Sequence, residues 1–344
     1  MSYQRDFDKY LTVGVIGTGS HCYRNILPVM NYLPVRLSAV CDINPESARK
    51  TAAQYGCRAY TTPAEMYEKE SLDAVFICVG PKQHPALITE ALRAKVNVWV
   101  EKPISVRTSQ IEEMIRNRGD CVVVVGLKKA FMPATYKALE VINSPDYGNL
   151  RSLLAVYPMK MEQNGEELLA ANETPNWLLN GVHPLSFLMR VGGEVKAVTT
   201  VSGRYGNGAV LLEYKSGVMG TLHLASGASP SREMYGVYGE NWSITVNDTR
   251  VGLQRGIPFE YTRTFNHVPK GFDSGEIVWE ADNCLATLEN KALFTQGFYN
   301  ETKYFCDCVL NGEKPTEGTL EFALEIMRVY EAAFCSHGAR IELT

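Results

Sequence analysis

Three short segments of the chain carry residue types that could bind a nucleotide and move a hydride and a proton. In the first, Gly17 and Gly19 hold the first two glycine positions of a G-x-G-x-x-G pattern, and Cys22 fills the third. Gly17 would allow a tight turn, and Gly19 would let the backbone approach a pyrophosphate. Asp42 ends the next apolar segment, and an acid there binds a ribose 2′-hydroxyl and repels a 2′-phosphate. This pattern favours NAD over NADP, and an aspartate that merely caps a helix is the alternative.

The other two segments could act on a substrate. Lys102 in Glu101-Lys102-Pro103 follows an apolar segment. A lysine held there can hydrogen-bond a substrate oxygen and stabilise the charge that develops during hydride transfer. His183, just before Pro184, can take a proton from a hydroxyl, since the ordinary histidine pKa of ~6.5 suits that role. The alternatives are a surface lysine after a strand and a structural histidine before a helix that starts at Pro184.

Strand-like and helix-like patterns alternate over residues 1–126 and would position the first two segments. Such alternation predicts a doubly wound parallel sheet covered on both faces, whose carboxyl strand ends line a ligand crevice. The predicted strands are 11–16, 36–41, 72–78, 97–100 and 121–125. The predicted helices are a stretch to about residue 33, shortened or kinked at Pro28, and then 45–55, 84–95 and 109–118.

After residue 126 the pattern changes to strands in series, which predicts an α+β domain over residues 127–344 with a mainly antiparallel sheet. A hairpin turn is expected at residues 215–217. The predicted strands are 149–157, 195–201, 209–214 and 218–224, with more between 235 and 265. The predicted helices are 182–190, 299–310 and 320–334.

Length and composition limit the class of protein. A chain of 344 residues, 45% hydrophobic and 21% charged, is expected to form about two packed domains. The net charge of −4 gives no basic excess of the kind that an extended nucleic-acid surface needs. No apolar run approaches ~18 residues and the start lacks a signal-peptide pattern, so we expect a cytoplasmic protein with no membrane partner. The nine scattered cysteines predict reduced thiols, and no spacing predicts a metal site.

Together these segments resemble the Gfo/Idh/MocA family, which includes glucose-fructose oxidoreductase and inositol dehydrogenase. The resemblance extends over almost the whole chain, and Glu-Lys-Pro is its most specific element. It implies an N-terminal Rossmann domain and a C-terminal α+β domain whose large, open, mainly antiparallel sheet commonly forms a dimer or tetramer interface. The matching segments are GVIGTGSH (14–21), LSAVCDINPESA (37–48), VFICVGPKQH (75–84), VNVWVEKPIS (96–105), VGLKKAFMPA (125–134), NGVHPLSFLMRVGG (180–193) and GFYNETKYFCDCVLNGEKP (297–315).

The resemblance also implies a role for individual residues. Lys102 matches the family's catalytic lysine, with a cis bond to Pro103, and His183 matches its catalytic histidine. Lys129 falls where many relatives carry a basic residue near the substrate. The residues that match the cofactor site are Gly17, Thr18, Gly19, Ser20 and His21 in the phosphate loop, Asp42 at the ribose, Cys78, Val79, Gly80 and His84 beside the nicotinamide ribose, and Glu101 and Lys102 beside the nicotinamide. Further substrate candidates, near the right segments, are Tyr157, Lys160, Trp177 and Asn180.

The sequence departs from the family pattern around the histidine. Many members carry aspartate four residues before it or three residues after it, where this chain has Leu179 and Ser186. Asn180 could make a polar contact but cannot take a proton. A histidine without a carboxylate to stabilise its cation is a weaker base, so the usual Asp–His proton relay is in doubt while the hydride chemistry is not.

We therefore expect an NAD-dependent oxidoreductase that acts on a secondary alcohol of a sugar, sugar derivative or cyclitol. His183 would take the hydroxyl proton, and Lys102 would hydrogen-bond the same oxygen. Asp42 makes NADP the less favoured cofactor. One alternative is a lyase or glycosidase that oxidises and re-reduces its sugar transiently, and another is a non-catalytic protein that senses NAD or a sugar. A homodimer or homotetramer is expected.

Overall fold

The chain divides into two compact units, and each is assembled from separate stretches of sequence. The computed structural model describes residues 6–229, 232–255, 275–280 and 292–343. Unit 1 comprises Met1–Phe131, Glu167–Thr174 and Ala292–Glu331, and unit 2 comprises Met132–Glu166, Pro175–Lys291 and Ala332–Thr344. These units differ from a single division at residue 126, because two later stretches pack with the N-terminal one. The assignment of a cofactor domain to 1–126 and a substrate domain to 127–344 stays a prediction.

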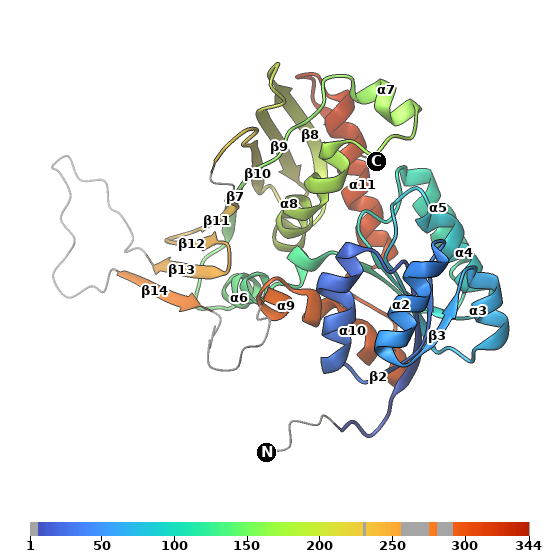
Figure 1. Cartoon of the computed structure of the whole chain (residues 1–344). Helices are drawn as coiled ribbons and strands as arrows, with labels where there is room; N and C mark the ends of the chain where they lie inside the picture. The colour runs from blue at the N-terminus through green and yellow to red at the C-terminus, as the bar shows by residue number, and fades with distance from the viewer. Residues whose placement is uncertain (1–5, 230–231, 256–274, 281–291, 344) are drawn as a thin grey trace, which may run out of the picture. The chain divides into compact units, whose positions relative to one another are not determined.

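Unit 1 is built on a parallel sheet of six strands in the order β3-β2-β1-β4-β5-β6; Figure 1 labels β2 and β3 of this sheet. This order places the reversal of winding between β1 and β4, and ligands of doubly wound sheets bind at the carboxyl ends of the strands on either side of it. The predicted parallel sheet is confirmed, and β3 is an additional strand. The strands are β1 (Leu11–Ile16), β2 (Val35–Cys41), β3 (Arg58–Tyr60), β4 (Ala74–Ile77), β5 (Asn97–Glu101) and β6 (Val123–Gly126).

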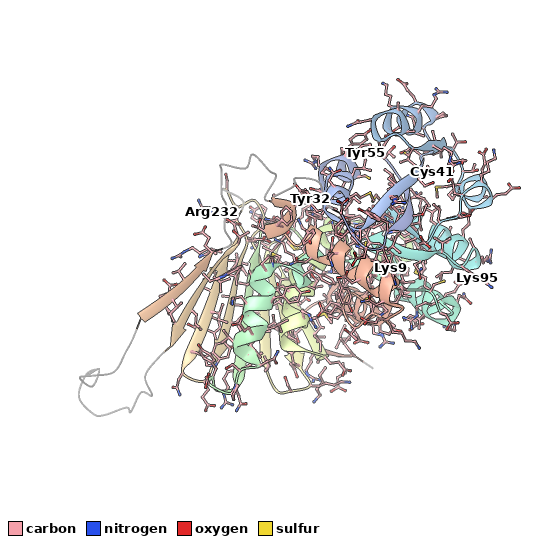
Figure 2. The ribbon with its side chains drawn as sticks, turned by 90° about the horizontal axis from the view of Figure 1, so that it is seen from below. Lys9, Tyr32, Cys41, Tyr55, Lys95 and Arg232 are labelled. Atoms are coloured by element: carbon pink, nitrogen blue, oxygen red, sulfur yellow. The ribbon has the colours of Figure 1, made fainter. Side chains whose placement is uncertain are left out.

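Local signals in the sequence place the helix α2 (Pro45–Tyr55) as predicted. Asn44 caps its first turn by accepting hydrogen bonds from the next backbone N–H groups, and Gly56 ends it with φ +67°. Figure 2 labels Tyr55, the last residue of this helix, and Cys41, which ends β2. The stretch that begins at Cys22 is helical as predicted, but it changes from a π-helical turn to an α and then a 3₁₀ turn around Pro28.

Helices from both ends of the chain cover the parallel sheet. The N-terminal helical elements are η1 (Cys22–Ile26), α1 (Leu27–Val29), η2 (Met30–Tyr32), α2, α3 (Pro63–Lys69), α4 (His84–Arg93), α5 (Thr108–Asn117) and η3 (Lys128–Ala130). The C-terminal ones are α9 (Ala292–Thr295), α10 (Phe298–Asn311) and most of α11 (Leu320–Cys335). Helix α10 packs against β5 and β6, and its Phe305 ring lies 5.5 Å from that of Phe76 on β4. The core under the carboxyl strand ends therefore depends on residues more than 200 positions apart.

Unit 2 contains a sheet of nine strands in the order β14-β13-β12-β11-β7-β10-β9-β8-β15. Neighbouring strands pair antiparallel except β7 and β10, which confirms the mainly antiparallel sheet. The Lys215–Gly217 turn joins β9 and β10 with Gly217 at φ +86°, as predicted. The strands are β7 (Leu150–Tyr157), β8 (Val195–Ser202), β9 (Gly208–Tyr214), β10 (Met219–Leu224), β11 (Met234–Gly239), β12 (Trp242–Asn247), β13 (Arg250–Arg255), β14 (Gly275–Glu280) and β15 (Ile341–Glu342). Of the strands expected between 235 and 265, residues 256–265 lie outside the described part.

The helix that carries His183 begins earlier than the sequence suggested. We expected it over residues 182–190 with Pro184 near its start, but α8 spans Asn176–Gly192 and Pro184 lies inside it. The proline removes one i→i−4 hydrogen bond. Nearly every side chain from Trp177 to Val191 is buried, so the packing of this helix outweighs the local proline signal. The other helices of this region, which the sequence did not predict, are α6 (Pro133–Ile142) and α7 (Gly165–Ala170). Among the described helices, none has the length and apolar character needed to cross a membrane.

Candidate functional site

The glycine turn after β1 lies directly against the segment that follows β4. Gly17 has φ +88°, and a Cβ atom there would stand 2.5 Å from the Cys78 carbonyl oxygen. Its N–H donates to the Cys41 carbonyl at 2.8 Å, so the turn spans the ends of three neighbouring strands. A Cβ on Gly19 would meet nothing within 4 Å. Gly17 is thus required by close packing, whereas Gly19 leaves its backbone open to a ligand.

Asp42 links the glycine turn to the start of α2. Its Oδ2 accepts hydrogen bonds from the backbone N and the hydroxyl of Thr18, both at 2.8 Å. Its Oδ1 accepts from the backbone N of Asn44 at 2.9 Å. Thr18 also lies 2.8 Å from the hydroxyl of Ser47. The carboxylate is therefore held at the carboxyl end of β2 beside the turn, where the sequence pattern expected a ribose-binding acid.

Glu101 connects the glycine turn to the lysine. Its Oε1 lies 2.7 Å from Nε2 of His21, and its Oε2 accepts from the backbone N of Lys102 at 3.1 Å. The side-chain nitrogen Nδ2 of Asn25, one helical turn after His21, lies 3.2 Å from the other imidazole nitrogen, Nδ1. The Glu101 side chain is buried and that of His21 is partly exposed. Two segments 80 residues apart in sequence thus meet through one carboxylate.

Lys102 lies in a buried cluster of opposite charges. Burial lowers its pKa, and the negative charges of Glu101 and Glu301 act against that shift. The peptide bond to Pro103 is cis, as the resemblance implied. A lysine held beside carboxylates in such a site can donate a hydrogen bond to a reacting oxygen and stabilise negative charge on it.

Glu301 belongs to this cluster and was missed in the sequence. Its side chain is fully buried, and among the residues that the structure describes neither carboxylate oxygen finds a hydrogen-bond partner. Burial and then the negative charge of Glu101 raise its pKa well above 4.5, against the opposing effect of Lys128 and Lys102. It shares the buried face of α10 with Phe298, three residues earlier. The sequence signal that could have identified Glu301 is an acidic residue on the apolar face of an amphipathic helix.

The residues after β4 support the lysine segment from the other side. Nδ1 of His84, a fully buried residue, lies 2.9 Å from the Pro103 carbonyl oxygen. Burial lowers the pKa of His84 to about 4, so its ring is neutral near pH 7. Burial and the neighbouring Cys22 raise the pKa of Cys78. Cys22, in the third glycine position, is itself buried and packs against this segment. Val79 and Gly80 complete it.

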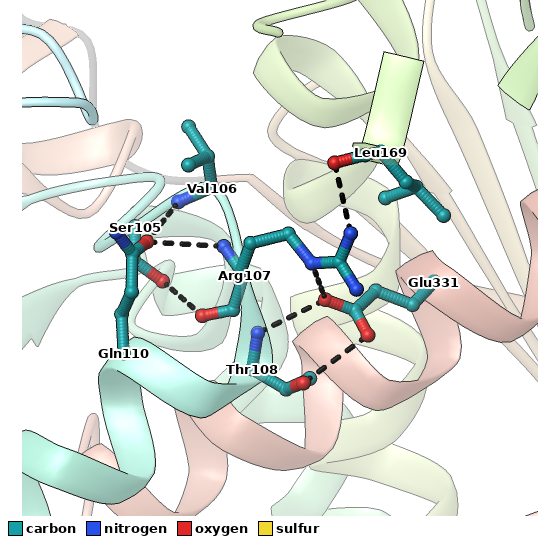
Figure 3. Close-up of polar contacts among 7 residues, drawn as sticks. All are labelled: Ser105, Val106, Arg107, Thr108, Gln110, Leu169 and Glu331. Atoms are coloured by element: carbon teal, nitrogen blue, oxygen red, sulfur yellow. Dashed lines mark hydrogen bonds and ion pairs between the residues drawn. The ribbon is translucent and has the colours of Figure 1, made fainter. Parts of the chain in front are cut away.

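Figure 3 shows how the loop after the lysine–proline pair is anchored within unit 1. Arg107 donates to the Leu169 carbonyl at 2.8 Å and forms an ion pair with Glu331 at 3.0 Å. The Glu331 carboxylate also accepts from the backbone N and the hydroxyl of Thr108, at 3.0 and 3.1 Å. Gln110 accepts from the backbone N of Arg107 at 3.2 Å. The loop is therefore held by α5, α7 and α11 together.

The remaining candidates in unit 1 differ in exposure. Lys129, in η3, is 2% exposed, and its Nζ donates to Gln296 at 3.3 Å. Lys128, beside it, lies over the ring of Phe298 at 4.6 Å. Ser20 is exposed at the start of the helical stretch. A role for Lys129 toward substrate stays a prediction.

In unit 2, His183 is 8% exposed in the middle of α8 and faces the end of β7. Its ring lies 6.2 Å from that of Tyr157, at an interplanar angle of 31°. Burial is the main cause that raises the pKa of Tyr157. The Ser186 hydroxyl donates to the His183 carbonyl at 2.8 Å; Ser186 and Leu179 hold the two positions where the family resemblance implied an aspartate.

Three other substrate candidates of unit 2 have unequal access to solvent. Trp177 is fully buried, and a Cβ on the neighbouring Gly181 would stand 2.5 Å from its ring, so it is a core residue. Lys160 is exposed, and its backbone N donates to Asn176 at 3.1 Å. Asn180 is half-buried one turn before His183. Their roles toward substrate stay predictions.

The model of an oxidoreductase family with an NAD-binding Rossmann fold, GFO_IDH_MocA, matches residues 11–127. That range contains the whole parallel sheet, the glycine turn, Asp42 and the Glu-Lys-Pro segment. This match places the Rossmann domain, residues 11–127, in the Gfo/Idh/MocA oxidoreductase family. The predicted family and fold class are confirmed, and the chain has the fold and family of an NAD(P)-dependent oxidoreductase.

Several relatives of this chain are sugar or cyclitol enzymes by name. It is 26% identical over 268 residues to dTDP-3,4-didehydro-2,6-dideoxy-alpha-D-glucose 3-reductase of Saccharopolyspora spinosa, covering 70% of this chain and 75% of the relative. It is 26% identical over 141 residues to myo-inositol 2-dehydrogenase of Thermotoga maritima, covering 40% of this chain and 42% of the relative. A solved oxidoreductase from Agrobacterium radiobacter, in complex with NAD+, L-tartaric acid and magnesium, has a TM-score of 0.80 at 17% identity, covering 97% of this chain and 98% of that one. This last similarity shows the shared fold.

Proposed function

We propose that the protein is an NAD-dependent oxidoreductase that moves a hydride between a secondary alcohol of a sugar, sugar derivative or cyclitol and a nicotinamide. The observation that carries this proposal is the position of Glu101. It touches His21 in the glycine turn at 2.7 Å and the backbone of Lys102 at 3.1 Å, so the proposed catalytic lysine is tied to the proposed phosphate loop. The sugar and cyclitol names of the relatives support the substrate class.

The residues of unit 1 fit a dinucleotide. The space over Gly19 is open where a side chain would otherwise stand, which leaves room for a pyrophosphate against the backbone. Asp42 is fixed by Thr18 at the end of β2 and would hold the ribose hydroxyls. Its negative charge disfavours a 2′-phosphate, which supports NAD as the proposed cofactor. Glu101 and the segment Cys78–Gly80, with His84 behind it, would border the nicotinamide ribose.

The proposed chemistry divides between two side chains. A bound nicotinamide supplies the hydride acceptor or, in the reverse direction, the hydride donor. Lys102 would hydrogen-bond the reacting oxygen and stabilise its partial negative charge, and burial strengthens such an interaction. His183 would take the hydroxyl proton during oxidation and return it during reduction, so one residue serves both directions.

The test compares Lys102→Ala with Lys69→Ala, a variant of an exposed lysine on α3 that pairs with Glu65. Wild type is incubated with NAD and a panel of inositols, sugars and sugar nucleotides, and with NADH and the corresponding ketones, and the NADH band is followed. We expect Lys102→Ala to lose turnover by about 100-fold or more while NAD binding persists. Lys69→Ala should match wild type. Unchanged turnover in Lys102→Ala would refute the mechanism, and tight NAD binding without turnover anywhere in the panel would refute the enzyme.

The expected homodimer or homotetramer remains part of the proposal. Val201, Leu211, Met219 and Tyr238 project from one face of the unit 2 sheet and are 39–63% exposed, a surface that suits association of two copies. Sedimentation velocity should show a dimer or tetramer. A monomer at micromolar concentration would contradict this part of the proposal without touching the chemistry.

A further inference from the structure

Glu233 lies at the same end of the unit 2 sheet as His183. In the antiparallel pairing of β11 with β7, Met234 is opposite Val156. The printed pairing ends there, and continuing its register by one position would set Glu233, just before β11, opposite Tyr157, the last residue of β7; the charge of Glu233 indeed acts on the Tyr157 hydroxyl. Opposed residues of an antiparallel pair project from the same face, with Cβ atoms about 5 Å apart. That face also carries the buried core residues which α8 covers.

Two aromatic pairs connect this carboxylate to the helix of His183. The hydroxyl of Tyr235 donates to Glu233 Oε2 at 3.1 Å, and its ring stacks on Phe187 with centroids 4.1 Å apart. One helical turn away, the rings of His183 and Tyr157 lie 6.2 Å apart. Because His183 and Phe187 are four residues apart, they share one face of α8. Glu233 is thus adjacent to both tyrosines that α8 covers.

The charges around this cluster favour a cation on His183. The negative charge of Glu233 adds to burial in raising the pKa of both Tyr157 and Tyr235. Both phenols therefore stay neutral near pH 7, and Glu233 provides the negative charge of the cluster. Other charged or titratable residues on the described surrounding elements include Lys160 and Glu162 after β7, Arg232 before Glu233 (labelled in Figure 2), His223 on the opposite face of β10, Arg190 two turns along α8, and Tyr136, Lys137 and Glu140 on α6, which packs against α8; the Glu162 carboxylate accepts from backbone N–H groups at the start of α8.

We propose that Glu233 is a positioning residue of the proton-transfer site, whose negative charge stabilises the imidazolium form of His183. This inference rests on the proposed function, in which His183 takes the hydroxyl proton as the hydride leaves the same carbon. The proton goes to an imidazole nitrogen, and the ring becomes a cation. A carboxylate nearby lowers the free energy of that cation and makes the neutral ring a stronger base. Glu233 would thus supply, from a neighbouring strand, the charge absent from Leu179 and Ser186.

The experiment measures the His183 titration directly in the full-length protein. The imidazole signals of ¹³C-histidine-labelled protein are followed by NMR against pH, and His183→Asn assigns the signal. The variants are Glu233→Gln, Tyr235→Phe and, as the matched control, Glu240→Gln, an exposed glutamate just past the other end of β11 that pairs with Arg151. Glu233→Asp, which keeps the charge, carries the test if Glu233→Gln does not fold.

We expect Glu233→Gln to lower the midpoint of the His183 titration by roughly half a pH unit to one unit, the effect of a unit charge at short range in a high effective dielectric. Glu240→Gln should leave it in place, and Tyr235→Phe, which keeps the charge, should move it far less. Glu233→Asp should lie between Glu233→Gln and wild type. A shift in Glu233→Gln no larger than in Glu240→Gln overturns the inference. The result is independent of turnover, so an inactive wild type would refute the proposed function alone.

Discussion

Replacement of Glu301 by glutamine gives a test of the buried charge cluster that needs neither substrate nor cofactor. The Glu301 side chain is fully buried, and both of its oxygens are without hydrogen-bond partners in the described part of the chain. Burial and the nearby charge of Glu101 raise its pKa well above 4.5, so the folded protein holds this acid in its neutral form at higher pH than the unfolded chain does. Glutamine has the same shape and is neutral at every pH. Glu301→Gln therefore imitates the state that the fold prefers.

The sign and size of the effect follow from proton linkage. Above pH 4.5 the unfolded chain releases the Glu301 proton while the folded protein keeps it, so unfolding releases a proton. The free energy of unfolding of wild type then falls by ~1.4 kcal/mol for each pH unit, until the folded pKa is reached. The free energy of unfolding of Glu301→Gln does not fall in this way, because glutamine does not titrate. The free energy of unfolding of the variant minus that of wild type should therefore increase by ~1.4 kcal/mol for each pH unit, which corresponds to about 2–4 °C in Tm.

The assay is thermal unfolding of both proteins at pH 5, 6, 7 and 8, read as the difference between variant and wild type so that shared titrations cancel. Glu70→Gln is the matched control. Burial raises the pKa of Glu70, but bonds from Ser38 and Tyr60 and the charge of Arg58 outweigh it, so the net shift is downward. The stability from this carboxylate is complete above pH 4.5 and is lost only below it, so Glu70→Gln should cost a constant amount from pH 5 to 8. A difference for Glu301→Gln that is flat across this range would refute the reasoning.

Three further predictions concern the dinucleotide site and its support. Gly17→Ala should lose about 2 kcal/mol or more of the free energy of unfolding, measured in urea, because φ is +88° and the new Cβ meets a carbonyl oxygen at 2.5 Å. Its partner variant Gly19→Ala should fold normally and bind NAD at least about tenfold more weakly, measured by calorimetry. Equal NAD affinity in Gly19→Ala and wild type would contradict the phosphate-loop assignment. Asp42→Ala should raise the affinity for NADP relative to NAD by about tenfold in paired titrations, and an unchanged ratio would show that this acid does not select the cofactor. Glu331→Gln, which weakens the ion pair with Arg107, should lower stability by about 1–2 kcal/mol without changing NAD affinity, and a loss of NAD affinity would show that the loop anchor acts on the site itself.

The N-terminal sheet was predictable because its signals are local. The helix Pro45–Tyr55 is bounded by an asparagine cap and a glycine stop, and both act within a few residues of chain. The three-residue β3 lacks such signals, and two of its residues are exposed. The seven-residue helix after it does begin with a proline, Pro63, but has no glycine stop, and it was not predicted from the sequence. The helix of His183 was predicted too short for a different reason. Pro184 is a local signal for the start of a helix, and the buried surroundings of α8 explain why the helix begins earlier, at Asn176, and continues through the proline.

In the candidate site, too, the residues marked by local sequence signals were predicted, and the residue whose role depends on distant segments was not. Gly17, Asp42 and Lys102 were found because each follows a strand of a parallel sheet, and that topology brings the carboxyl ends of strands together. Glu301 was missed because its partners Lys102 and Glu101 are 200 positions away, and helix periodicity says which face of α10 is buried but not what it is buried against.

Glu233 shows why a missing motif residue does not by itself establish a missing function. The sequence around His183 has leucine and serine where relatives carry an acid, which counts against proton transfer if the acid must come from the same helix. A charge acts through space, however, and the pairing of β11 with β7, which ends with Met234 opposite Val156, leaves Glu233 close enough for its charge to act on Tyr157, whose ring lies 6.2 Å from that of His183. The register of two strands can therefore place near His183 the negative charge that no neighbouring residue on its own helix provides. Since a shift of one residue would turn Glu233 to the opposite face, the pairing itself becomes part of the proposed chemistry.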